Sequence, residues 1–230
     1  MIAVLFALPH ESSAFLRLLQ NSTRGPAGSH TIAGTSHGHA VCVLHTGVGE
    51  KTTRARLEKF LRAQTPQLLI SAGFAGALSE QWRVGDLLHA QNFSSAPIVF
   101  AAHVGYRTGT LATVPAMIDS PAERQALAGT GADAVDMETA HIAAACAAAN
   151  VPMISLRVIS DTPAAPFPAP PQVMFNVERQ GTSFVPLFAH LLLHPTAIGR
   201  FISFARQIAH ARQSLAQALD ALVRSAPLQR

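Results

Sequence analysis

The sequence predicts an α/β protein, a single-domain three-layer α/β/α sandwich with a mixed central sheet. Short continuous apolar runs, such as Ile2–Leu8 and Gln67–Ser71, are typical of strands buried on both faces. Segments with helical spacing, such as Glu50–Arg62, alternate with these runs. The chain has 230 residues, 49% of them apolar, which is enough for one large core.

In the first half of the chain, buried strands alternate with two helices. The expected strands are Ile2–Leu8, Thr31–Ala33, Ala40–His45, Gln67–Ser71 and Asp86–Gln91. The expected helices are Glu11–Leu19 and Glu50–Arg62. The polar segment Asn21–Ser29 contains Gly and Pro, and it therefore predicts a loop.

The second half has fewer strands and ends in helices. The expected strands are Thr110–Val114, Ala132–Val135 and Met153–Ser160, and residues 93–108 look irregular. The expected helices are Pro121–Leu127 with proline at its start, the Ala-rich segment after Glu138, Phe184–Leu193 and Ala197–Val223. Because Pro163–Pro171 is dense in proline, it is neither helix nor central strand. Residues 162–230 are thus a proline-rich loop plus C-terminal helices on the same domain, 1–230.

Charge is sparse, at 13% of residues, with a net charge of +4. The arginines are scattered, and the lysines are Lys51 and Lys59, so the basic stripe of a nucleic-acid binder is missing. Few charges on an apolar chain favour a homo-oligomer, a dimer or higher, that covers apolar faces. Cys42 and Cys146 lie in apolar segments, which favours a reducing cytoplasm. We expect neither a signal peptide nor a membrane span.

Two acidic elements flank the Ala-rich helix and the strand that follows it. Asp136-Met137-Glu138 precedes the helix, and Ser160-Asp161 ends the strand. A carboxylate at a helix start and another at a strand end converge on one rim of a parallel sheet, where open α/β sheets bind ligands. With only 13 acidic residues in the chain, this placement predicts a functional site.

Three other patterns fail as motifs. Thr46–Thr52 (TGVGEKT) resembles a P-loop, but Glu50 stands where glycine is required. His37 and His39 lie in a turn without a third ligand nearby, so we expect no metal site. Residues 34–38 (GTSHG) have the spacing Gly-x-Ser-x-Gly, but they lie between two expected strands and not between a strand and a helix, which argues against a serine hydrolase.

The order of elements resembles the nucleoside phosphorylase and nucleosidase superfamily. The residues that carry the resemblance are IAVLFALPHE (2–11), TGVG (46–49), SAGFAGAL (71–78), VGD (84–86), VDME (135–138) and RVISD (157–161). The general likeness is to the 5′-methylthioadenosine/S-adenosylhomocysteine nucleosidases. A closer likeness is to the hopanoid-associated phosphorylases, through SAGFAGAL, VDMET with His141, and the tail. It implies a phosphorylase/hydrolase-like fold and cleavage of a purine N-glycosidic bond.

The resemblance assigns the acidic residues roles in that reaction. Asp161 would be the general acid that protonates the leaving purine, oriented by Ser160, since a desolvated carboxyl keeps its proton near neutral pH. Glu138 would accept hydrogen bonds from the ribose hydroxyls, and Met137 would lie under the ribose. The structural alternatives are a turn cap for Asp161, a first-turn acid for Glu138 and a core residue for Met137.

Three further assignments are less specific. Asp136 fits a substrate-binding role and a helix N-cap equally well. Glu11 would activate the attacking water, or it is only a first-turn helix acid. Gly73, Phe74, Ala75 and Gly76 would form a turn that presents N–H groups to the nucleophile, or only a tight strand-to-loop turn.

The sequence departs from the family where phosphate binds. Family arginines are absent at Pro9-His10 and Ile70-Ser71, which favours hydrolysis, whereas the hopanoid likeness favours phosphate as co-substrate. Residues 93–108 are short for a base-holding segment, and His45, His103 or Arg107 would supply its polar group.

These considerations predict phosphorolysis of a 5′-substituted, adenosylhopane-like adenosine without a cofactor. The lipidic substrate would bring the enzyme into peripheral membrane contact. A hydrolytic nucleosidase and a non-catalytic purine-binding module are the alternatives.

Overall fold

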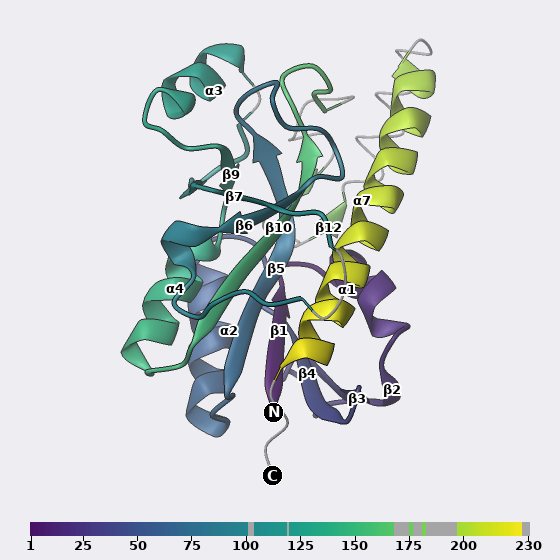
Figure 1. Cartoon of the computed structure of the whole chain (residues 1–230), viewed down its shortest axis with the longest axis vertical. Coiled ribbons are helices and arrows are strands. Elements are labelled where there is room, and N and C mark those ends of the chain that lie inside the picture. The colour runs from purple at the N-terminus through teal and green to yellow at the C-terminus, as the bar shows by residue number, and fades with distance from the viewer. Residues whose placement is uncertain (101–103, 119, 168–174, 177–180, 183–196, 227–230) are drawn as a thin grey trace.

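A mixed ten-stranded sheet forms the centre of the molecule (Figure 1). The computed structural model describes residues 1–100, 104–118, 120–167, 175–176, 181–182 and 197–226. The four central strands are parallel: β4 (His39–His45), β1 (Ile2–Phe6), β5 (Leu68–Ala77) and β10 (Met153–Asp161). Their carboxyl ends therefore meet at one edge of the sheet.

The remaining strands extend the sheet on both sides. They are β2 (Gln20–Arg24), β3 (Thr31–Ser36), β6 (Leu87–Ala90), β7 (Arg107–Gly109), β8 (Leu111–Thr113) and β9 (Ala134–Asp136). β10 pairs antiparallel with β6, and β5 pairs antiparallel with β9, which makes the sheet mixed, as predicted. A separate antiparallel pair joins β11 (Phe175–Asn176) to β12 (Gly181–Thr182).

The loop predicted over 21–29 is wrong in its first part, because Gln20–Arg24 is the edge strand β2. All five of its residues are exposed, and it pairs antiparallel with β3. An edge strand needs only backbone hydrogen bonds to one neighbour, so its side chains carry no hydrophobic pattern. Sequence periodicity could not reveal it.

Helices cover both faces of the sheet, which confirms the three-layer sandwich. α1 (Pro9–Leu16) and α7 (Ala197–Ser225) lie on one face, and α2 (Glu50–Ala63) and α4 (Thr139–Ala148) lie on the other (Figure 1). The short 3₁₀ helix η1 (Gln91–Phe93) follows β6, and α3 (Pro121–Ala128) lies between β8 and β9 in the chain. Among the helices of the described ranges, none is at once sufficiently long and sufficiently apolar to cross a bilayer.

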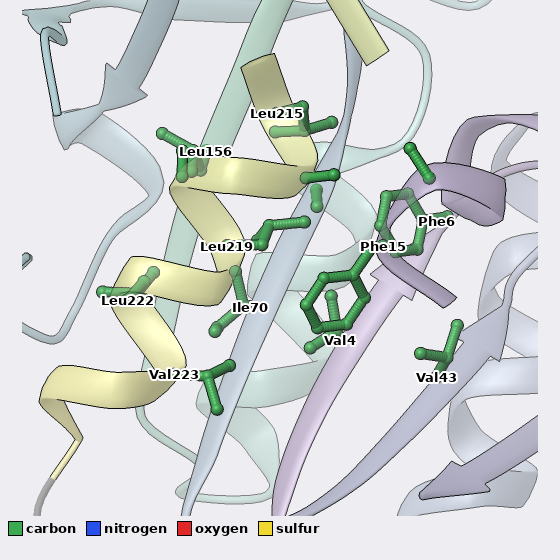
Figure 2. Close-up of a cluster of buried hydrophobic side chains, with 14 of the residues drawn as sticks. Val4, Phe6, Phe15, Val43, Ile70, Leu156, Leu215, Leu219, Leu222 and Val223 are labelled. Carbon is green, nitrogen blue, oxygen red and sulfur yellow. The ribbon is translucent and has the colours of Figure 1, made fainter. Parts of the chain in front are cut away.

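Strand β1 divides its side chains between the two layers. Val4 and Phe6 pack with Phe15 of α1 and with the C-terminal half of α7 (Figure 2). Ala3 and Leu5 face α2 and α4 instead. This alternation at period two is expected of a strand buried on both faces.

Helix α7 has two different halves. Its C-terminal half buries Leu215, Leu219 and Leu222 in the core, as the periodicity predicts (Figure 2). Its N-terminal half leaves Ile198 and Ile202 about half exposed, at 45% and 46%. The predicted helix Phe184–Leu193 and the prolines from 168 onward lie outside the described residues.

The predicted Gly-rich turn at residues 73–76 is wrong, because these residues continue strand β5. Gly73 pairs with Arg157 and Gly76 pairs with Asp161, with an irregularity between Ile159 and Asp161. The segment is extended because β10 on one side and β9 on the other hold its backbone. Its length places Asp161 directly against Gly76.

Candidate active site

A pocket of about 410 Å³ lies at the carboxyl edge of the central strands. This volume is typical of small-molecule sites. Nine of the ten residues predicted from the sequence line it: Glu11, Phe74, Ala75, Gly76, Asp136, Met137, Glu138, Ser160 and Asp161. Gly73 does not belong to the lining. The structure thus brings together segments from β1–α1, β5, β9–α4 and β10.

Asp161 lies on the pocket floor at the end of β10, with 1% of its surface exposed. The Ser160 hydroxyl donates a hydrogen bond to its Oδ1 at 2.7 Å. Asp161 is desolvated, as expected, but its surroundings also hold a charged group, because Arg124 of α3 forms a buried ion pair with Oδ2. Ser160 and Arg124 thus each donate to one of its oxygens. In this arrangement Asp161 is therefore a hydrogen-bond acceptor.

Glu138 immediately precedes α4 and is also buried, at 8% exposure. The backbone N–H of Gly49, at the start of α2, donates to its Oε1 at 2.9 Å. Burial raises the pKa of Glu138 to about 8, with repulsion from Asp136 adding to the effect. At neutral pH this carboxyl is mainly protonated, and it can both donate and accept hydrogen bonds.

Glu11 is a first-turn helix acid, as one of its two alternatives predicted, and it also lines the pocket. It is the third residue of α1, and its Oε2 accepts a hydrogen bond from the Leu8 N–H at 3.0 Å. Its side chain also lines the pocket. Burial raises the pKa of Glu11 above its ordinary value. A helix-capping acid and a pocket carboxyl are thus the same residue.

Asp136 belongs to a buried network of polar side chains. Its carboxylate accepts from the Thr113 hydroxyl at 2.8 Å and from the Thr139 N–H at 3.1 Å. It also pairs with Arg157 at 3.0 Å, and Arg157 in turn donates to Ser71 Oγ at 2.8 Å. The contacts with Thr139 match the N-cap alternative. Asp136 therefore anchors the start of α4 in addition to lining the pocket.

Gly73 supports the site from behind its wall. A Cβ atom at this position would lie 2.5 Å from Nη1 of Arg157 and 3.7 Å from Oε1 of Glu11. The missing side chain thus lets the Arg157 guanidinium approach the strand backbone. Arg157 was quoted within a motif, but sequence reasoning gave it no role, because a buried arginine inside an apolar strand has no local signal.

Two of the three residues expected to supply a polar group beside the base have partners elsewhere in the protein. His45 Nε2 hydrogen-bonds to Ser12 Oγ at 2.8 Å, and Arg107 lies over the Trp82 ring at 3.9 Å. Neither residue lines the pocket, and His103 lies outside the described residues. The lining does include Ala116, Met117, Ile118 and Arg124, all of which sequence reasoning missed.

An apolar wall closes the pocket on the side of α7. Phe201, Phe204 and Ile208 recur at helical spacing on this wall, and Phe167 packs edge-on against Phe204 with ring centroids 5.8 Å apart. Arg212 continues the same face at its far end. The pocket therefore has an acidic floor and an aromatic side.

The acidic floor and the aromatic side are features of a protein that binds a small molecule. The pocket lies at the carboxyl edge of the sheet in an α/β/α sandwich. The chain belongs to the phosphorylase superfamily, whose family model matches residues 1–96 and 99–193. The fold and the family therefore agree with the resemblance seen in the sequence.

The curated relatives are nucleosidases. The chain is 25% identical to 5′-methylthioadenosine/S-adenosylhomocysteine nucleosidase from Actinobacillus succinogenes, over 70% of this chain and 85% of that protein. It is 30% identical to the enzyme of the same name from Chromohalobacter salexigens, over 50% of this chain and 49% of that protein. It is 23% identical to aminodeoxyfutalosine nucleosidase from Campylobacter jejuni, over 70% and 85% respectively.

Solved structures share the fold over nearly the whole chain. One is the Streptococcus pneumoniae MTA/SAH nucleosidase in complex with 8-aminoadenine, with a TM-score of 0.69 and 21% identity over 98% of this chain and 99% of that one. Another is the Helicobacter pylori futalosine hydrolase, with a TM-score of 0.70 and 19% identity over 98% and 97%.

Proposed function

We propose that this protein is an enzyme that cleaves the N-glycosidic bond of a purine nucleoside. The observation that carries the proposal is the convergence of Asp161, Glu138 and Glu11 on one pocket of about 410 Å³. Breaking this bond develops positive charge on the ribose and negative charge on the purine. Carboxyl groups in a desolvated site can stabilise the first and protonate the second. The nucleosidase relatives add to this support.

Asp161 is the proposed proton donor to the leaving base, and Ser160 fixes its orientation through the 2.7 Å hydrogen bond. Glu138 binds the ribose hydroxyls from the opposite wall, and Met137 lies beside it in the lining. Within the described part of the chain Glu138 accepts one hydrogen bond, from the Gly49 N–H to Oε1, and in this proposal Oε2 binds the ligand. Hydrogen bonds to the hydroxyls strengthen as the ring gains positive charge.

The substrate in this proposal is an adenosine with an apolar 5′ substituent, such as an adenosylhopane. Phe167, Phe201, Phe204 and Ile208 supply an apolar wall beside the acidic floor. A saturated lipid group would bury its surface there, at about 25 cal/mol per Å². The exposed Ile198 and Ile202 extend this side of α7 and suit peripheral contact with a membrane that holds such a substrate.

Water is the nucleophile that the site favours. Glu11 lines the pocket and, in its ionised form, can accept a proton from water. Phosphate is the second candidate, because Arg212 lines the pocket and the raised pKa values of Glu11 and Glu138 reduce the repulsion of an anion. The family includes the phosphorylases by name.

Adenine release from 5′-substituted adenosines tests the proposal, measured with and without inorganic phosphate. We expect release to require Asp161 and to be faster for long apolar 5′ groups than for adenosine. Release without phosphate assigns hydrolysis, and dependence on phosphate assigns phosphorolysis. Adenine binding in calorimetry with no product under either condition would instead identify a purine-binding module.

A further inference from the structure

Arg124 belongs to the pocket wall, and most of the N–H groups of its guanidinium donate to the protein itself. It lies on α3 with 5% exposure, and its Nη1 donates to the Ala77 carbonyl at 2.6 Å. Its Nη2 pairs with Asp161 and reaches the Ile118 carbonyl at 3.4 Å. A guanidinium has five N–H donors, and these contacts use three of them. Arg124 is therefore poorly placed to read a base directly.

The same contacts occupy both oxygens of Asp161. Ser160 donates to Oδ1, and Arg124 donates to Oδ2. A purine nitrogen that is to take a proton from Asp161 must come within hydrogen-bond distance of one of these oxygens. The purine therefore competes with Arg124 for Oδ2.

Helix α3 is lightly attached to the molecule. Its Leu127 and Ala128 pack on the small cluster Leu78, Ala132 and Val135 at the rim of the sheet. Gly131, just after the helix, has a φ of +87°, which favours glycine at this joint. Elements with few buried apolar contacts open at a lower free energy than the central strands do. Because α3 packs on this small cluster at the rim, we expect it to withdraw Arg124 more readily than a central strand could move.

We propose that Arg124 is a positioning residue that occupies Oδ2 of Asp161 until a purine enters and displaces it. The incoming base takes the space between Ile118 and Asp161, and Arg124 moves away with α3. Proton delivery is thereby restricted to the complex with a base. This inference rests on the proposed role of Asp161 as the acid.

Adenine binding to three folded proteins tests it: the wild type, Arg124→Met and Arg124→Lys. In this proposal adenine binds only when Arg124 has left Asp161. The apparent affinity of the wild type for adenine is therefore lower than the intrinsic affinity, in proportion to the fraction of protein in that state. We expect Arg124→Met to bind adenine about tenfold more tightly and to lower KM for the nucleoside. Arg124→Lys retains the charge, so we expect it to stay near the wild type. Weaker or unchanged adenine binding in a folded Arg124→Met protein would overturn the proposal, because a merely structural role cannot produce a gain.

Hydrogen exchange on the wild-type protein provides a second measurement that needs no variant. We expect adenine to slow amide exchange at the pocket strands β5 and β10 and to speed it in α3. Uniform protection of α3 by adenine would contradict the release of Arg124. If the wild type releases no base while Arg124→Met still binds adenine more tightly, the proposed function fails and the positioning role stands.

Discussion

The Glu138 carboxylate and the Gly49 backbone N–H are joined by a hydrogen bond of 2.9 Å, across 89 positions of the sequence. This contact connects the start of α4 to the start of α2 at the pocket wall. A helix start carries unpaired N–H groups and a positive partial charge, so it is a suitable partner for an acid. The two helices thus fix one carboxyl at the place where the proposed ribose binds.

Glu138→Gln is expected to change how stability depends on pH. The folded pKa of Glu138 is about 8, above its value in the unfolded chain, so the unfolded state loses this proton first as pH rises. Each pKa unit corresponds to about 1.4 kcal/mol, and the free energy of unfolding should fall between about pH 4.5 and 8. Gln mimics the protonated acid and removes this loss. Urea unfolding at pH 5 and pH 8 measures it, and an equal fall in both proteins would contradict the assignment.

His45 should make the free energy of unfolding fall as the pH is lowered, whereas Glu138 makes it fall as the pH is raised. Burial lowers its pKa to about 4, with His30 and Arg56 adding to the effect. Below about pH 6.5 the unfolded chain takes up a proton that the folded protein refuses, so stability falls as pH drops from 6.5 toward 4. We expect His45→Gln to flatten this part of the stability curve. His37→Gln, at a surface pair with Asp220, is the control and should leave the slope in place.

Asp161→Asn should keep the fold and lose at least about a hundredfold in kcat/KM, the lower end for general acid catalysis. The amide retains the size of the carboxyl but cannot transfer a proton. Asp86→Asn, which does not line the pocket, is the matched control and should stay within about twofold. A wild-type rate in the Asp161 variant would remove this residue from the mechanism.

Gly73→Ala should impair the site although Gly73 lies outside the pocket lining. Its Cβ would meet Arg157 Nη1 at 2.5 Å, so the guanidinium must leave its contacts with Asp136 and Ser71. We expect a loss of about 1–3 kcal/mol in stability, together with reduced turnover. Gly105→Ala is the control, because nothing lies within 4 Å of its added Cβ. Thermal unfolding and adenine release measure the two effects separately, and unchanged values for both would refute the packing argument.

Phe204→Ser tests the apolar wall. Phe204 lines the pocket and contacts Phe167, whereas Ile202 on the same helix is exposed and outside the lining. We expect Phe204→Ser to raise KM about tenfold for substrates with long alkyl 5′ groups and to leave adenosine nearly unchanged, in line with 1–3 kcal/mol for a buried apolar side chain. With substrates supplied in solution without membranes, Ile202→Ser should alter neither value. Equal effects on both substrates would place the 5′ group elsewhere.

The sequence predicts the layers and the acidic floor well because both rest on local patterns. Buried strands appear as apolar runs, and a carboxylate at the end of a strand such as β10 has to lie at the sheet rim. The alternation along β1 and the face of α7 that carries Leu215 and Leu219 follow from the same periodicities.

The polar partners of the floor could not be predicted in this way. Arg124 meets Asp161 across 37 positions, and Arg157 meets Asp136 across a helix and a strand. Such pairs depend on tertiary contacts that leave no periodic trace. The strand at Gly73–Gly76 was mistaken for a turn because glycine usually marks a break, whereas here its neighbours on both sides impose the extended backbone.

The two halves of helix α7 have different roles. Ala211, Leu215, Leu219 and Leu222 pack in the interior, while Phe201, Phe204, Ile208 and Arg212 line the pocket. Substitutions in the second group can reshape what the protein accepts without undermining how it folds. Duplicated copies of this gene could therefore diverge toward new metabolites by changes within a few helical turns.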